Sequence, residues 1–250
     1  MINLIKGDLQ RIVRKWSFWF VFILGIIYNV INVVYVMQTG LYNSYTFMNQ
    51  NVVDIMQDCG FIIGIIIFLA VYADEFKTMT ITTVIGEGIS RLNVILAKFI
   101  DSVILTAGLF ILYTIHLPIF NMIAGVTVAD DEKKLLYLTV LIGAIYTIGC
   151  LAIASMVIYI TGSIPFAVMT VVMLYFIIPA VMGLLNYIKI LRSFHLERYD
   201  LHGITMMGMT DILLGSTFRG IFTLLLGFLI YAVGSQVIAY IVFNKKELDF

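Results

Sequence analysis

Four residues in the stretch FHLERYDLH have side chains of the kind that bind metal ions. They are His195, Glu197, Asp200 and His202. Imidazole nitrogens and carboxylate oxygens that lie close together can coordinate a zinc ion. Their spacing, however, matches neither a helix-face pair nor a finger motif, and a polar loop would contain the same residue types. The sequence therefore favours a polar loop over a metal site.

Asp101 is a second candidate for chemistry, because it interrupts the apolar stretch 94–120. A carboxyl group inside a membrane helix can serve an ion-driven carrier, although a charge there costs about 2.5–3.5 kcal/mol. Lys98 lies three residues earlier, so an ion pair along one helix face is the simpler interpretation of Asp101. His116 is expected near a helix end at the membrane surface. Asp101 and His116 are kept as candidate polar groups of a transport path.

Sequence motifs for hydrolysis are missing from the chain. No G-x-x-x-x-G-K-[ST] loop is present to hold the phosphates of ATP, and no H-E-x-x-H or G-x-S-x-G motif occurs. Cys59 and Cys150 lie in apolar runs, form no C-x-x-C pair and are interpreted as small hydrophobic residues. We therefore expect the chain not to be an enzyme and to bind no cofactor or metal ion itself.

The composition around these groups indicates a membrane protein. Hydrophobic residues make up 62% of the chain and charged residues 12%, whereas soluble domains have about 45–50% and about 25%. An apolar surface of this extent would aggregate in water, so lipid is the expected solvent. The formal net charge is zero, which gives no reason to expect nucleic-acid binding.

Six segments are apolar and long enough to cross a bilayer, which takes about 20 residues, provided that the second extends upstream. They are residues 16–37, 59–73, 94–120, 135–161, 164–185 and 221–243. Each must be helical, because lipid offers no partner to an unpaired backbone amide. The sequence predicts one all-α membrane domain over residues 1–250, with six transmembrane helices.

Two further segments are predicted to lie at the membrane surfaces. Residues 1–16 place apolar side chains at helical spacing and cations on the other face, which predicts an amphipathic helix in the inner interface; a plain charged flank is the alternative. Residues 186–218 are too apolar for a solvated loop and too short to span, which predicts short re-entrant helices in the outer leaflet. The cations before the first span place both termini in the cytoplasm. The expected anchors at the inner surface are Arg11, Arg14, Lys15, Trp16 and Lys98.

The turn between the second and third spans contains more charged residues and threonines than a short connection between two helices requires. It contains E-F-K-T-M-T, a short helical run, then S-R and A-K. This pattern resembles the corresponding turn of the ABC-2 family of ATP-binding-cassette permeases, which has a glutamate, a threonine five residues later, S-R, and a lysine as the third span begins. The matching residues are Glu75, Thr80, Ser90, Arg91 and Lys98. Met79 departs from the family, which often has glycine before the threonine.

The resemblance covers essentially the whole chain and implies a coupling helix within residues 74–93. Such a helix docks on a separate ATP-binding subunit, which binds the ATP and magnesium and hydrolyses the ATP. The residues implied in docking are Glu75, Phe76, Met79, Thr80, Ile81, Thr83, Ser90 and Arg91. The resemblance also implies a second permease copy or a paralogue around a central path, surrounded by membrane lipid.

In size and layout the chain is similar to small bacterial permeases for bacteriocin or lantibiotic immunity, bacitracin resistance and modulin-like peptide export. This implies a subunit of the bacterial plasma membrane that exports amphipathic peptides or other hydrophobic antimicrobial compounds. One alternative is an immunity or sensing module that binds a membrane-active peptide without a through-path. Another is an ATP-independent ion-coupled carrier or scaffold, in which Asp101 would matter and Glu75 and Thr80 would not. The substrate, and the choice between identical and paralogous permeases, stay open.

Overall fold

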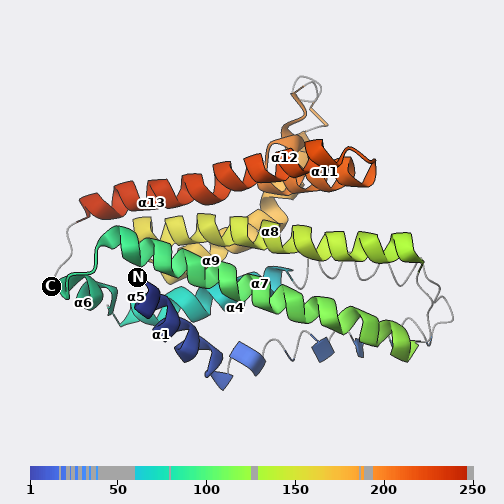
Figure 1. Cartoon of the computed structure of the whole chain (residues 1–250). Coiled ribbons are helices and arrows are strands. Elements are labelled where there is room, and N and C mark those ends of the chain that lie inside the picture. The colour runs from blue at the N-terminus through green and yellow to red at the C-terminus, as the bar shows by residue number, and fades with distance from the viewer. Residues whose placement is uncertain are drawn as a thin grey trace.

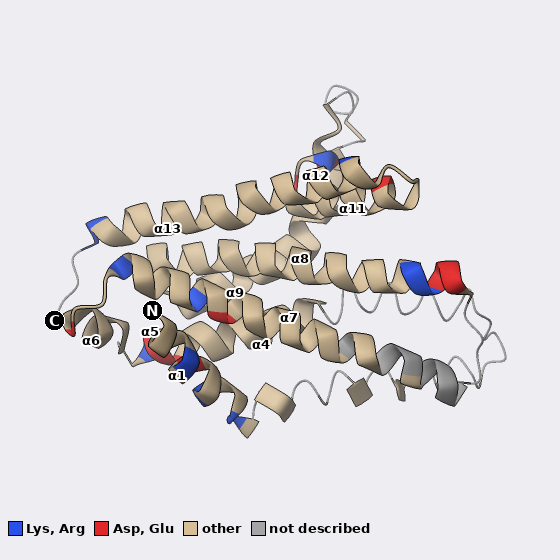
Figure 2. Ribbon diagram, viewed as in Figure 1, with Lys and Arg blue, Asp and Glu red and all other residues tan. Residues whose placement is uncertain are grey.

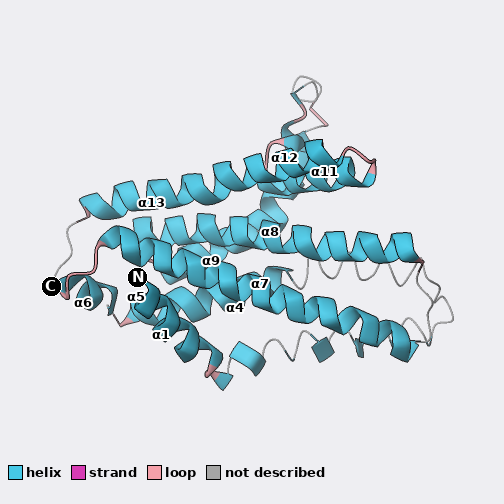
Figure 3. Cartoon of the chain, in the orientation of Figure 1, coloured by secondary structure: helices cyan, strands magenta, loops and turns pink. Residues whose placement is uncertain are grey.

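The computed structural model describes residues 1–16, 18–20, 60–78, 80–124, 129–185, 187–188 and 194–246, together with residues 23, 26, 27, 30, 31, 34 and 38 (Figure 1). Within these ranges the side chains at 113, 116–118 and 120–124 are left undescribed. The described part of the chain is helical and contains no strand (Figure 3). The all-α prediction is therefore confirmed for these residues. Most of the first predicted span and the loop after it lie outside them.

The helices at the start of the described chain are short. They are α1 (Ile2–Val13), α4 (Gly60–Phe68), the π-helix η2 (Leu69–Ala73), α5 (Asp74–Lys77) and α6 (Thr80–Gly86). Two long helices follow, α7 (Arg91–Ala124) and α8 (Asp130–Thr161). The next helix consists of α9 (Ile164–Val172), the π turn η3 (Met173–Ile177) and α10 (Ile178–Leu185). After the 3₁₀ turn η5 (Leu196–Arg198) and α11 (Leu201–Leu213), the last helix consists of α12 (Thr217–Phe228), the π turn η6 (Leu229–Val233) and α13 (Gly234–Lys245).

Four helices in the described residues are long and apolar enough to cross a membrane. They are Arg91–Leu112, Asp130–Thr161, Ile164–Leu185 and Thr217–Lys245. They overlap four of the six predicted spans, and their length and composition are those of helices in a membrane protein. The total of six spans stays a prediction.

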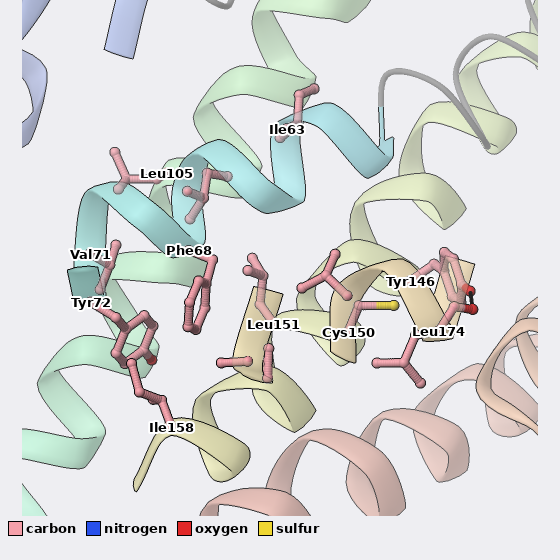
Figure 4. Close-up of a cluster of buried hydrophobic side chains, with 14 of the residues drawn as sticks. Ile63, Phe68, Val71, Tyr72, Leu105, Tyr146, Cys150, Leu151, Ile158 and Leu174 are labelled. Carbon is pink, nitrogen blue, oxygen red and sulfur yellow. Dashed lines mark hydrogen bonds between the residues drawn. The ribbon is translucent and has the colours of Figure 1, made fainter. Parts of the chain in front are cut away.

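Helix α8 lies at the centre of the molecule, with the other long helices around it (Figure 1). In its most apolar stretch 67% of the residues are buried inside the molecule, against 11% for Ile164–Leu185. The buried face of α8 packs on α4, α7, α9 and α13. Figure 4 shows the core that results, in which Phe68 and Tyr72 stack at 5.1 Å and lie with Leu151 and Ile158. The apolar faces left exposed on the outer helices suit contact with lipid.

One end of the molecule collects α1, α5, α6, the start of α7 and the ends of α8 and α13 (Figure 1). We call it the α6 end. The opposite end holds the last turns of α7 and the start of α8. Figure 2 shows charged residues near the ends of the long helices and almost none along their middle parts, the arrangement expected of spans in lipid.

Three π-helical segments interrupt the described helices, and each contains a tyrosine. A π turn widens a helix locally and commonly marks a functional position. The Tyr175 hydroxyl of η3 lies 2.8 Å from the Thr147 hydroxyl, and the Tyr231 hydroxyl of η6 donates to the Tyr199 carbonyl at 2.5 Å. The Tyr72 hydroxyl of η2 is buried and lies near the hydroxyls of Ser102 and Ser155 without a hydrogen bond of normal geometry. Of these three tyrosines, Tyr72 is therefore the one whose hydroxyl is least well satisfied.

Within the segment predicted to hold short re-entrant helices, the described residues 194–216 form the 3₁₀ turn η5 and the α-helix α11. Asp200 begins α11, because its Oδ1 accepts a hydrogen bond from the Gly203 amide at 3.0 Å. Helix α11 then folds back along α12 and also packs on α8. Its re-entry into the outer leaflet stays a prediction.

Candidate functional site

The candidate site is the α6 end, where four charged residues form one connected group. Lys98 Nζ is 2.5 Å from Asp8 Oδ2 and also contacts Glu75 Oε1. Arg11 Nη2 lies 2.7 Å from the same Glu75 oxygen and 3.4 Å from Asp8 Oδ1. We call these residues, Asp8, Arg11, Glu75 and Lys98, the ion cluster. They join α1, α5 and α7.

The ion cluster is electrically balanced, and it is buried except at Arg11, whose side chain is 38% exposed. The Lys98 side chain is 1% exposed, and the side chains of Glu75 and Asp8 are 10% and 12% exposed. Two acids face two bases, so each charge has an opposite partner at hydrogen-bond distance. Burying charges costs free energy, and that cost is offset only where the pairing is close and complete. The cluster therefore fixes the relative positions of three helices as long as all four members are present.

Helix α6 has one face packed on the molecule and one face exposed. Ile81 is buried, and Val84 and Ile85 pack against the main core. Thr80 and Thr83 are exposed three residues apart, so they lie on the same side of the helix. A helix of seven residues cannot be stable by itself, and its packed face must hold it. The exposed face is then available to a partner.

A cavity of about 190 Å³ lies between α6, α1 and α7. Its lining residues are Leu4, Asp8, Arg11, Glu75, Thr80, Ile81, Val84, Val94 and Lys98. The ion cluster therefore forms one wall of a small space beneath α6.

The start of α7 is fixed by two residues of the S-R pair. Ser90 Oγ accepts a hydrogen bond from the Asn93 amide at 3.3 Å, as in a helix N-cap. Arg91 Nη1 donates to the carbonyls of Phe243, Asn244 and Lys246 at 2.5, 3.1 and 2.7 Å. Its guanidinium also lies 5.5 Å from the centre of the Phe243 ring. Arg91 thus donates to three carbonyls at the end of α13, where helix carbonyls lack the amides of a following turn.

Aromatic rings continue this connection across the α6 end. The Phe76 and Tyr159 rings are 5.5 Å apart between centroids, and the Tyr159 and Phe243 rings are 5.0 Å apart.

Four of the predicted docking residues, Glu75, Phe76, Ile81 and Arg91, make contacts inside the molecule. Met79 lies outside the described residues. The surface left for docking is the α6 face with Thr80 and Thr83.

The predicted surface anchors also divide into two sets. Arg14 and Trp16 are exposed, and the Trp16 side chain is among the most exposed apolar groups, at 74%. Lys15 instead contacts Asp74, and this contact lowers the pKa of the Asp74 carboxyl below its ordinary value. Arg11 and Lys98 belong to the ion cluster. Of the five predicted anchors, Arg14 and Trp16 are thus the two whose side chains are exposed and make no contact with Asp8, Asp74 or Glu75.

Asp101 does not form the expected ion pair with Lys98. Lys98 Nζ turns to Asp8 and Glu75, because α1 and α5 bring both carboxylates next to it. Asp101 is 0% exposed, and neither of its carboxyl oxygens has a hydrogen-bond partner. His116 lies within α7, but its side chain is not among those described.

Three residues of the FHLERYDLH stretch, Glu197, Arg198 and His202, line a second cavity of about 530 Å³ beside α11. His195 Nδ1 is 3.3 Å from Glu197 Oε1, whereas the His202 ring packs on Tyr146 at 5.7 Å. Burial lowers the pKa of His202 and raises that of Asp200. In the part of the chain that the structure describes, no three His, Cys, Asp or Glu residues are placed to hold a metal ion.

Asp8 is the member of the site that the sequence did not reveal. It lies on the amphipathic segment, and only its i, i+3 spacing to Arg11 indicates a pair.

Comparisons of the chain with protein-family models, curated proteins and solved structures find no match.

Proposed function

We propose that the chain is the membrane subunit of an ATP-driven exporter, and that the exposed face of α6 docks on a separate ATP-binding subunit. The proposal begins with the resemblance of residues 74–93 to the ABC-2 coupling turn. The observation that supports it best is the two-sided α6, with Ile81 packed on the spans and Thr80 and Thr83 exposed. A helix of this kind can transmit a partner's movement to the membrane helices.

The connections around α6 explain how such a movement would spread. Helix α5 precedes α6 and is tied through Glu75 to α1 and α7. Helix α7 follows α6 and is tied through Arg91 to the end of α13. A displacement of α6 would therefore move α1, α7 and α13 together. The partner would bind ATP and magnesium and hydrolyse the nucleotide, and this chain would supply the conduit.

The proposed assembly contains two permeases, identical or paralogous, in the plasma membrane of a bacterium, with both termini in the cytoplasm. The substrates we propose are amphipathic peptides or other hydrophobic antimicrobial compounds, moved out of the membrane or the cell. The exposed apolar surface of Ile164–Leu185, of which 11% is buried within the chain, would face lipid or the second permease.

Extraction of the tagged chain from its own membrane in mild detergent tests the proposal. We expect a soluble ATP-binding protein to co-purify in stoichiometric amount. Thr83→Arg, on the exposed face of α6, should remove that protein. Thr161→Arg is the matched control, because Thr161 is also exposed and ends α8 at the same end of the molecule. It should retain the partner.

Purification of the chain without an ATP-binding protein would contradict the proposal and favour an ATP-independent carrier or scaffold. An equal effect of Thr83→Arg and Thr161→Arg would contradict docking through α6. Transport of a labelled amphipathic peptide into inverted vesicles then separates export from an immunity module, which would bind the peptide without moving it across.

A further inference from the structure

Asp101 is a carboxyl group for which the surrounding protein provides no partner. It is fully buried, and both of its oxygens lack a hydrogen bond. It stands ten residues after Arg91, about 15 Å along the helix axis at the rise of an α-helix. Asp101 also stands within Arg91–Leu112, a helix long and apolar enough to cross a membrane. Within the described residues, no Lys or Arg side chain forms a hydrogen-bonded ion pair with it.

The charges that face Asp101 already compensate one another. Asp8 and Arg11 approach from α1, Glu75 from α5, and Lys98 from the preceding turn of α7, and all four are within its electrostatic reach. They form the ion cluster, with two acids and two bases. An ionised Asp101 would add a third acid without a third base. The cluster is balanced only while Asp101 is neutral.

Two buried phenol groups lie beside Asp101. Tyr72 approaches from η2 and Tyr159 from α8, their rings are 6.2 Å apart, and both are within electrostatic reach of Asp101. The Tyr159 hydroxyl has no hydrogen-bond partner, and the Tyr72 hydroxyl lies near the hydroxyls of Ser102 and Ser155 without a hydrogen bond of normal geometry. A carboxylic acid both donates and accepts, and so does a phenol, so the two kinds of group suit one another as hydrogen-bond partners. A carboxylate could only accept.

We propose that Asp101 is a proton-binding site, which holds its carboxyl group as a neutral acid beside the ion cluster. Release of the proton places an uncompensated charge next to Lys98 and its partners. The protonation of Asp101 is thereby linked to the packing of α1, α5 and α7. The cation is a proton and not a metal ion, since the described residues offer no group of metal ligands and the cavity beside the ion cluster is not lined by Asp101.

Infrared spectroscopy of the purified full chain in lipid nanodiscs tests the proposal. At about pH 7 the spectrum should contain the carbonyl stretch of a protonated carboxylic acid, which moves when H₂O is replaced by D₂O. Asp101→Asn should remove that band. Asp131→Asn should keep it, because Asp131 is an exposed acid at the start of α8. Tyr72→Phe keeps the acid but removes a neighbouring hydroxyl, so the band should remain at a shifted frequency.

A missing band at about pH 7, or a band that survives Asp101→Asn, would overturn the proposal. If Asp101→Asn fails to fold, the wild type and Tyr72→Phe still decide the matter. An identical band in Tyr72→Phe and Tyr159→Phe would show that the acid lies elsewhere. The experiment uses neither an ATP-binding partner nor a substrate, so its result is independent of the proposed export function.

Discussion

Two junctions of this molecule hold helices together by opposite means. At the α6 end, α1, α5 and α7 meet through the ion cluster, in which Lys98 lies between Asp8 and Glu75. At the other junction, α11 and α12 meet through glycines. A Cβ atom added to Gly208 would stand 2.6 Å from Leu224, and one added to Gly220 would stand 2.6 Å from the Gly208 carbonyl oxygen.

The difference has a consequence for movement. Packing between backbones has short range and is lost when helices separate slightly, so a glycine junction favours one rigid arrangement. Ion pairs act over longer distances and depend on the charge of each member. The ion-paired junction can therefore respond to a change of charge or to a pull on α6, while the α11–α12 junction keeps its form.

Lys98→Met should have the largest effect on stability. The substitution leaves the carboxylates of Asp8 and Glu75 buried without their shared cation, which typically costs about 3–5 kcal/mol. The midpoint of thermal unfolding in detergent should fall accordingly. Lys134→Met is the control, because the Lys134–Asp131 pair is 3.4 Å long and largely exposed, and we expect no measurable change. Equal midpoints for both variants would show that the ion cluster does not stabilise the α6 end.

Gly220→Ala should have the next largest effect. Its methyl group meets backbone at both Gly208 and Ile212, and backbone cannot move aside as a flexible side chain can. We expect destabilisation of about 1–3 kcal/mol, as for overpacked sites, measured as faster hydrogen exchange in α11 and α12. Gly183→Ala in α10 has nothing within 4 Å and should be neutral or slightly stabilising. A neutral Gly220→Ala would mean that the two helices lie further apart.

The contact between Lys15 and Asp74 should have the smallest effect and should depend on pH. Lys15 lowers the pKa of Asp74 below its ordinary value of 3.8. A carboxyl group with a lowered folded pKa stabilises the fold above its unfolded pKa, and this contribution is lost as pH falls through the folded value. The contact should thus hold from neutral pH to about pH 4 and weaken below it.

Tryptophan emission can follow this change, since the two tryptophans of the chain, at positions 16 and 19, lie within four residues of Lys15. We expect an emission shift below about pH 4 in the wild type and a smaller one in Asp74→Asn. The same shift in both proteins would assign it to another group.

The long apolar helices were predictable because a bilayer crossing requires about 20 consecutive apolar residues, and such a run is visible in the sequence itself. Four of the predicted segments became helices that include Arg91–Leu112, Asp130–Thr161, Ile164–Leu185 and Thr217–Lys245. The amphipathic pattern of residues 1–16 likewise predicted α1. Both signals depend on neighbours within a few turns, so no knowledge of tertiary packing was needed.

The partners of charged residues were not predictable in the same way. Lys98 has Asp101 three positions away, yet it pairs with Asp8, which is 90 positions away, and with Glu75, which is 23 positions away. Which acid reaches Lys98 depends on how α1 and α5 pack against α7, and a sequence pattern does not contain that. For the same reason the sequence did not reveal the contact of Arg91 with carbonyls at the end of α13.

The hydrogen bonds from Arg91 to the end of α13 can form only late in the synthesis of the chain. Arg91 is translated about 150 residues before its carbonyl acceptors, which follow at sequence separations of 152 to 155. Until then the start of α7 lacks this tie, and α6 is joined to an incomplete bundle. We expect a ribosome-bound chain stopped before α13 to be cleaved by protease near α6, and a chain released after residue 246 to resist. The α6 end would thus reach its final form only once the last helix has been made.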